Sequence, residues 1–123
     1  MGKTVLIVDD SNTMRKIVSR ALRQAGIDFD TILEAGDGQE ALTVLSSNKV
    51  DVVLSDINMP NMTGLEFLKA KSENASIKDI PVVMISTETG ADIIDEAKSL
   101  GAKGAIKKPF TPELINETLG ALL

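Results

Sequence analysis

Short apolar runs rich in β-branched residues recur along the chain and alternate with segments of helical spacing. Continuous apolar runs of this length are typical of strands that are buried on both faces of a sheet. Five such runs predict five strands: TVLIV from Thr4, TIL from Thr31, VDVVL from Val50, PVVMI from Pro81 and the weaker GAI from Gly104.

The segments between these runs carry the spacing and the end signals of helices. Apolar residues at positions 14, 17, 18, 21 and 22 recur with the period of one helix face. Start and stop signals accompany this spacing, because polar caps begin helices and glycine ends them. These signals are the cap pairs Thr63 with Glu66 and Thr89 with Asp92, the cap and proline at Thr111 and Pro112, and the terminating Gly26 and Gly101.

Five strands and five helices in strict alternation predict an α/β fold. We expect a doubly wound, five-stranded parallel sheet with helices on both faces and right-handed crossovers. The expected strand order is 2-1-3-4-5, which reverses direction between the first and third strands. Ligands bind outside the carboxyl ends of strands at such a point, so the residues that follow each strand are the candidates for chemistry.

Length and composition narrow the class further. The 123 residues, 43% of them hydrophobic, are enough for one core and too few for two ordinary domains, so we expect a single domain over residues 1–123 without an output domain. The absence of Cys excludes disulfides and thiolate metal sites. No apolar run has the length of a signal-peptide core or a membrane span, which predicts a cytoplasmic protein.

Charge and aromatic content exclude several kinds of ligand. The chain has 13 basic and 18 acidic residues and a net charge of −5, which disfavours binding to nucleic acid. There is no Trp or Tyr and there are three Phe, so the aromatic platforms that stack bases or flavins are lacking. A protein partner is therefore expected, with no nucleic acid and no membrane.

Polar residues follow four of the five predicted strands. They are Asp9 and Asp10, Asp56, Ser86 and Lys108. In the expected strand order these side chains converge on one edge of the sheet. Three neighbouring carboxylates repel one another, and a hard divalent cation such as Mg²⁺ relieves that repulsion. A hydroxyl and an ammonium group can bind phosphoryl oxygens, so the set contains the parts for phosphoryl transfer onto a carboxylate.

Four motifs resemble the receiver domains of two-component response regulators. They are DD at residues 9–10, SDINMPNMTG from Ser55, MIST ending at Thr87, and KKPFTP around Lys108. The resemblance extends over the whole chain and is closest to stand-alone receivers of the CheY type. Such receivers are a standard example of the 2-1-3-4-5 order, so the resemblance and the expected order are not independent.

The resemblance implies a role for each site residue. Asp56 would accept a phosphoryl group from a sensor histidine kinase or a small phosphodonor. Asp10, Asp56 and the Asn58 backbone carbonyl would bind Mg²⁺, with Asp9 acting through a water. Lys108 would contact the phosphoryl group and Ser86 would close on it, while Asn58 and Glu88 would tune the rate of dephosphorylation. The protein would catalyse only its own phosphorylation and dephosphorylation, and so would not be an enzyme with a separate substrate.

Position 105 departs from the pattern of the family. Receivers of this type usually carry an aromatic switch residue three positions before the lysine, and this chain has Ala105. We therefore expect the segment between Ser86 and the fourth helix to carry the conformational switch. The protein is expected to be a monomer that acts in chemotaxis or motility signalling. Its target is expected to bind the surface of the fourth helix, fifth strand and fifth helix. Ala105 removes a large side chain from this surface, which argues against binding to a flagellar motor switch.

Three alternative functions compete with a signalling switch. A phosphate sink or shuttle in a phosphorelay would share the same chemistry without a target of its own. A Mg²⁺-dependent phosphatase with an Asp nucleophile would need an acid two residues after Asp56, where this chain has Asn58. A flavodoxin-like FMN binder would need aromatic residues around the ligand, and Asp9 and Asp10 would repel its phosphate.

Overall fold

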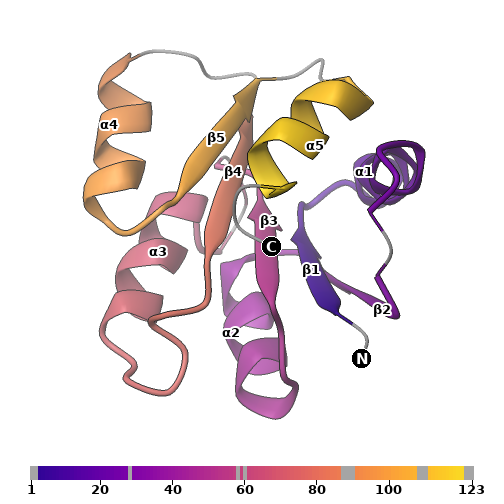
Figure 1. Ribbon diagram of the computed structural model, residues 1–123. Coiled ribbons are helices and arrows are strands. Elements are labelled where there is room, and N and C mark those ends of the chain that lie inside the picture. Colours follow the sequence, from indigo (N-terminus) through magenta and orange to yellow (C-terminus); the bar gives the residue numbers. More distant parts are fainter. Residues whose placement is uncertain are drawn as a thin grey trace.

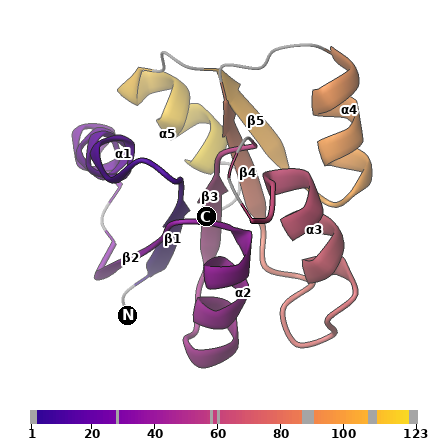
Figure 2. The same ribbon diagram turned by 180° about the vertical axis from the view of Figure 1, so that it is seen from behind.

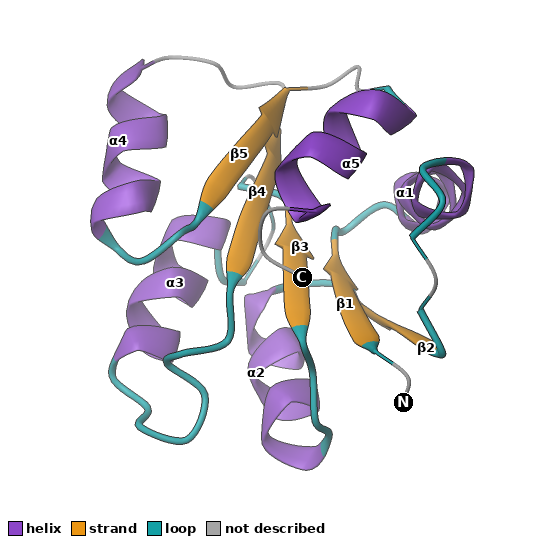
Figure 3. Ribbon diagram, in the orientation of Figure 1, coloured by secondary structure: helices purple, strands orange, loops and turns teal. Residues whose placement is uncertain are grey.

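The computed structural model describes residues 3–27, 29–57, 59, 61–86, 91–107 and 111–120. Strands and helices alternate along the whole of this part of the chain (Figure 3). The strands are β1 (Thr4–Val8), β2 (Thr31–Ala35), β3 (Val52–Ser55), β4 (Val82–Ser86) and β5 (Gly104–Lys107). The helices are α1 (Asn12–Gln24), α2 (Gly38–Ser47), α3 (Gly64–Ser72), α4 (Ala91–Ser99) and α5 (Pro112–Gly120).

The five strands form one parallel sheet in the order β2-β1-β3-β4-β5, which confirms the predicted fold (Figure 1). Helices α1 and α5 cover one face, and α2, α3 and α4 cover the other (Figures 1 and 2). All strands run the same way, so their carboxyl ends share one edge of the sheet.

Two apolar clusters fill the space between the sheet and its two helix layers. Alternate residues of a strand point to opposite faces. On β1, Val5 and Ile7 therefore belong to the cluster beneath α1 and α5, whereas Leu6 and Val8 belong to the cluster beneath the other three helices. Residues 5–8 and 52–55 are fully buried, as expected of central strands. The edge strand β2 is partly exposed and ends on buried Ala35.

Most of the predicted helix ends are confirmed. Thr63 and Glu66 form a reciprocal capping box at α3, and the Thr111 hydroxyl accepts from the backbone N–H of Leu114 at α5. Helix α1 is capped by Ser11, whose hydroxyl accepts from the Met14 N–H. Gly26 and Gly101 follow α1 and α4 with φ of 79° and 111°, a conformation that glycine adopts without a steric cost. The predicted cap Thr89 lies outside the described residues.

Gly64 is needed for a different reason, because it lies where the chain passes close to itself. Its N–H donates to the Ile57 carbonyl at 2.7 Å. A Cβ at this position would overlap the Asp56 carbonyl oxygen and lie 2.7 Å from Met84 Cε. Gly64 is not among the described glycines with positive φ, which are Gly26 and Gly101. The absence of a side chain thus lets the start of α3 pack directly behind the end of β3.

We expect Gly64→Ala to lower the free energy of unfolding by about 1–3 kcal/mol, the usual cost of overpacking a close contact. Gly120→Ala is the matched control, because a Cβ there would meet only Asn116 Oδ1, at 3.9 Å. The control should be neutral or slightly stabilising, since Ala favours a helix over Gly. Urea denaturation of both variants checks this, and equal stabilities would contradict the packing role of Gly64.

Candidate metal centre

Strand pairing brings three predicted acidic residues to one point on the carboxyl edge of the sheet. In the β1 and β3 pair, Val8 lies opposite Ser55, so the next residues on both strands, Asp9 and Asp56, leave the sheet side by side. Backbone hydrogen bonds continue past the strands: Asp56 N–H donates to the Val8 carbonyl at 2.9 Å, and Asp9 N–H donates to the Ala35 carbonyl at 3.1 Å. The main chain of both acids is therefore fixed by the sheet.

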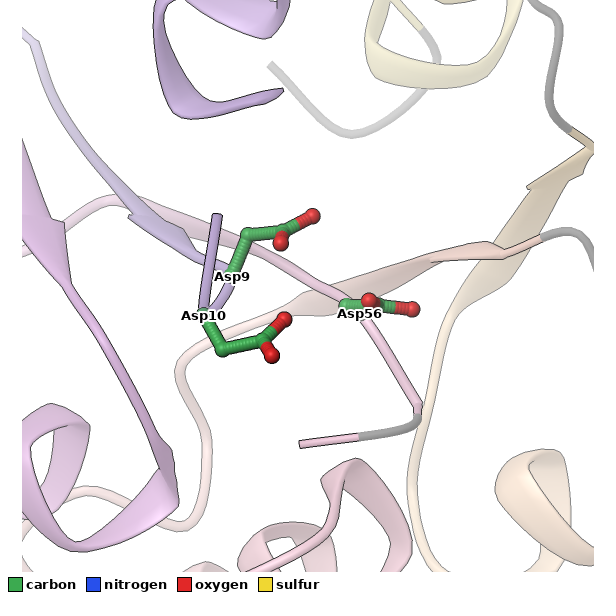
Figure 4. A group of neighbouring side chains, drawn as sticks. All are labelled: Asp9, Asp10 and Asp56. Atoms are coloured by element: carbon green, nitrogen blue, oxygen red, sulfur yellow. The ribbon is translucent and has the colours of Figure 1, made fainter. Parts of the chain in front are cut away.

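The carboxylates of Asp9, Asp10 and Asp56 point toward a common space (Figure 4). One oxygen of each lies within 4.8 Å of the oxygens of the other two. Asp9 is buried, Asp56 is half-buried and Asp10 is exposed. The cluster therefore opens to solvent on the side of Asp10.

Backbone N–H groups orient two of these carboxylates. Ser11 N–H donates to Asp9 Oδ1 at 2.9 Å, and Ile57 N–H donates to Asp56 Oδ1 at 2.7 Å. Hydrogen bonds to charged acceptors are stronger than those between neutral groups, so they hold two repelling carboxylates in fixed orientations. Oxygen ligands on a partly open site suit a hard divalent cation that keeps several waters, and the residues present fit Mg²⁺.

The loop between β3 and α3 is tied to the start of α2. Asn61 has a left-handed φ of 64°, and its side-chain amide donates to Asp37 Oδ2 at 2.9 Å. Asp37 also caps α2 by accepting from the Glu40 N–H, and this hydrogen bond, followed by that from Asn61, lowers the pKa of its carboxyl below the usual value. This contact was not predicted from the sequence, although Asn is one of the few residues that adopt a left-handed conformation readily.

Of the remaining site residues predicted from the sequence, two are placed by the structure. Ser86 is the last residue of β4, opposite Lys107 of β5, so its main chain reaches the same edge of the sheet as the acids. Ala105 pairs with Met84 and packs half-buried against the apolar cluster on the α4 side. Asn58, Glu88 and Lys108 lie outside the described residues. Their predicted roles stay predictions.

The sequence profile of the response regulator receiver domain matches residues 5–120. With this fold and an acidic cluster at the strand edge, the chain belongs to the family of response regulator receiver domains, whose general function is phosphorylation-based signalling. The predicted family is thereby confirmed.

Several relatives are chemotaxis proteins of the CheY type. The chain is 41% identical over 115 residues to chemotaxis protein CheY of Pseudomonas aeruginosa, covering 94% of this chain and 91% of that protein. It is 39% identical over 120 residues to CheY1 of Helicobacter pylori, covering 97% of this chain and 95% of that protein.

Solved structures of CheY proteins have the same fold. The structure of Vibrio cholerae CheY4 has a TM-score of 0.88 and 41% identity, with full coverage of both chains. The Borrelia burgdorferi CheX–CheY–BeF3–Mg²⁺ complex has a TM-score of 0.86 and 29% identity, covering 98% of this chain and 88% of that one.

None of the helices in the described part of the chain has the length and apolar character needed to cross a membrane.

We expect Asp10→Asn to stabilise the metal-free protein by about 1–2 kcal/mol. Two unit charges 4 Å apart repel by about 1 kcal/mol in water and by more where the effective dielectric constant is lower. Millimolar Mg²⁺ should raise the melting temperature of the wild type, because a ligand that binds only the folded state stabilises it. The variant should gain much less from Mg²⁺, since it keeps only two of the three carboxylates of the cluster.

Asp95→Asn, at an exposed position on α4, is the control for loss of one negative charge. It should respond to Mg²⁺ as the wild type does. Thermal unfolding with and without Mg²⁺ checks both variants. If Asp10→Asn were destabilising without metal, or gained as much from Mg²⁺ as the wild type, the three carboxylates would not form the proposed cation site.

Proposed function

We propose that the protein is a phosphorylation-controlled signalling switch in which Asp56 accepts a phosphoryl group. The observation that carries this proposal is the cluster of three carboxylates at the carboxyl edge, with oxygens within 4.8 Å of one another. Membership of the receiver family supports it. Asp56 stands at the end of a fully buried strand, so its position is rigid while its carboxylate reaches the surface.

The proposed reaction is an in-line transfer to a carboxylate oxygen of Asp56. A new bond forms between this oxygen and phosphorus, and the bond from phosphorus to the donor breaks, with the donor being a phosphohistidine of a sensor histidine kinase or a small phosphodonor. The Ile57 N–H bond to Asp56 Oδ1 sets the orientation of the attacking group. Positioning and charge stabilisation account for most catalysis in phosphoryl transfer, because the protein supplies little covalent chemistry.

Asp9, Asp10 and Asp56 would hold Mg²⁺, with the Asn58 carbonyl as a further ligand and Asp9 acting through a water. When bound, the cation neutralises charge on the phosphoryl oxygens. The neutralisation matters here because three carboxylates at the acceptor would otherwise repel an anionic donor. Asp56 therefore serves both as a ligand and as the acceptor.

Lys108 and Ser86 are proposed to bind the phosphoryl group after transfer. Support comes from the parallel sheet, in which the ends of β4 and β5 share one edge with β1 and β3 (Figure 1). Asn58 and Glu88 are proposed to tune the rate of dephosphorylation. In this account the chain is a single receiver domain, which is supported by CheY relatives of similar length. It catalyses only its own phosphorylation and dephosphorylation and signals in the cytoplasm.

The proposed output is protein contact through the surface of α4, β5 and α5. A Borrelia burgdorferi CheY relative in complex with CheX supports partner binding by a receiver of this fold. Ala105 lies in β5 and, like Ile93 and Leu100, packs partly buried against the apolar cluster on the α4 side. Its methyl group offers no large side chain that could turn inward. We propose that the segment from Ser86 to α4 changes conformation instead, driven by the phosphoryl charge.

Ala105 also favours a second candidate, a phosphate sink or shuttle. A receiver without a large switch residue could drain phosphoryl groups from a shared kinase without a target of its own. Rapid turnover of the phosphorylated state together with no phosphorylation-dependent partner would favour this candidate over the switch.

Incubation with acetyl phosphate and Mg²⁺ should add about 80 daltons to the intact mass, the mass of one phosphoryl group on the acceptor carboxylate. Asp56→Asn should abolish the gain, and omission of Mg²⁺ should reduce it strongly. Asp95→Asn, at an exposed position far along the chain from the cluster, should leave it unchanged. A full mass gain in Asp56→Asn would show that the acceptor is another residue. If neither the wild type nor Asp95→Asn gained mass, the proposed reaction would be contradicted.

A further inference from the structure

Arg15 of α1 reaches behind the acidic cluster and connects three parts of the fold. Its Nη1 donates to the Asp9 carbonyl at 2.5 Å, its Nε donates to Glu34 Oε1 of β2 at 2.8 Å, and its Nη2 donates to Asn12 Oδ1 at 3.3 Å. The Arg15 side chain is 17% exposed and that of Glu34 is 47% exposed. The guanidinium is thus a largely covered bridge between α1, β2 and the end of β1.

The Asp9 carbonyl belongs to the peptide group that joins Asp9 to Asp10. The hydrogen bonds of Asp9 include three within the described residues: its N–H donates to the Ala35 carbonyl, its Oδ1 accepts from the Ser11 N–H, and its carbonyl accepts from Arg15. The first two fix Asp9 itself. The Arg15 bond fixes the peptide plane from which Asp10 starts, and therefore the direction in which the exposed Asp10 carboxylate leaves the main chain.

Glu34 sets the position of the guanidinium. It accepts from Nε on one side of the planar group while Nη1 faces the Asp9 carbonyl, so both bonds use the fixed geometry of an arginine fork. A lysine has a single ammonium on a flexible chain and cannot make two bonds in these directions at once. The bridge therefore depends on Arg, and not only on a positive charge.

Charge and geometry have opposite effects on cation binding at this position. The positive charge of Arg15 repels a cation bound by the neighbouring carboxylates, so loss of the charge alone would strengthen binding. Loss of the bridge would let the Asp9–Asp10 peptide rotate and would weaken binding. Groups behind metal ligands commonly change metal affinity by about 10–100-fold when they are removed.

We propose that Arg15 is a positioning residue for the Asp9–Asp10 turn, held in place by Glu34, and that its geometric role outweighs its charge. The proposal deepens the proposed cation site and rests on it. It assigns Mg²⁺ affinity to a side chain that does not touch the ion. It also means that the ion pair between Arg15 of α1 and Glu34 of β2 supports the geometry of the cation site.

The test is Mg²⁺ titration of the purified chain by calorimetry, with the wild type compared with Arg15→Lys, Arg15→Gln and Glu34→Gln. We expect both Arg15 variants to bind Mg²⁺ about tenfold more weakly, and Glu34→Gln to fall between them and the wild type. Arg20→Gln is the matched control, because Arg20 is exposed on the same helix and carries the same charge. It should bind as the wild type does or slightly more tightly.

Unchanged binding by Arg15→Lys together with tighter binding by Arg15→Gln would overturn the proposal, since charge would then be the whole effect. A second readout needs no metal. In amide NMR spectra of the metal-free protein, Arg15→Lys should shift the resonances of Asp10 and Ser11, whereas Arg20→Gln should not. Unmoved Asp10 and Ser11 amides would also overturn the proposal. If the wild type bound no Mg²⁺ while Arg15→Lys still shifted the Asp10 and Ser11 resonances, the result would count against the proposed cation site and not against the positioning role.

Discussion

The parallel pairing of β1 with β3 is the constraint on which the site depends. Val8 lies opposite Ser55, so Asp9 and Asp56 follow at the same height on neighbouring strands. Residues 5–8 and 52–55 are buried on both faces of the sheet. A slip of one residue would turn the side chains to the opposite face, so the apolar core fixes the register. Hydrophobic burial thereby holds together carboxylates that would otherwise separate.

Contacts around the cluster convert this enforced proximity into an ordered site. The N–H groups of Ser11 and Ile57 donate to two of the carboxylates, and α1 starts at Asn12, after its cap Ser11. On the other side, the bond between Asn61 and Asp37 ties the loop after β3 to α2. The fold holds the three carboxylates close together and already oriented, although they repel one another. Binding of a cation would relieve this repulsion, so the site favours a bound cation. This arrangement is consistent with a family whose function is phosphorylation-based signalling.

Local patterns predicted the strands, most helix ends and the acidic cluster, because burial and strand ends leave a signal within a few residues. The contacts of Arg15 with Glu34 and of Asn61 with Asp37 were missed, since their partners are 19 and 24 residues apart and meet only once the sheet is assembled. The need for glycine at position 64 leaves no such local signal, because it arises from the close approach of the start of α3 to the Asp56 carbonyl. Tertiary contacts of this kind depend on the path of the main chain and not on residue type alone.

The role of Asp56 can be tested with a crystal structure of the protein grown with Mg²⁺ and beryllofluoride, which mimics a phosphoryl group on a carboxylate. We expect beryllium to be bonded to a carboxylate oxygen of Asp56 and Mg²⁺ to be bound beside it by Asp10 and Asp56. A structure with Mg²⁺ bound away from these carboxylates, or with the beryllofluoride group on another acid, would contradict the proposed site.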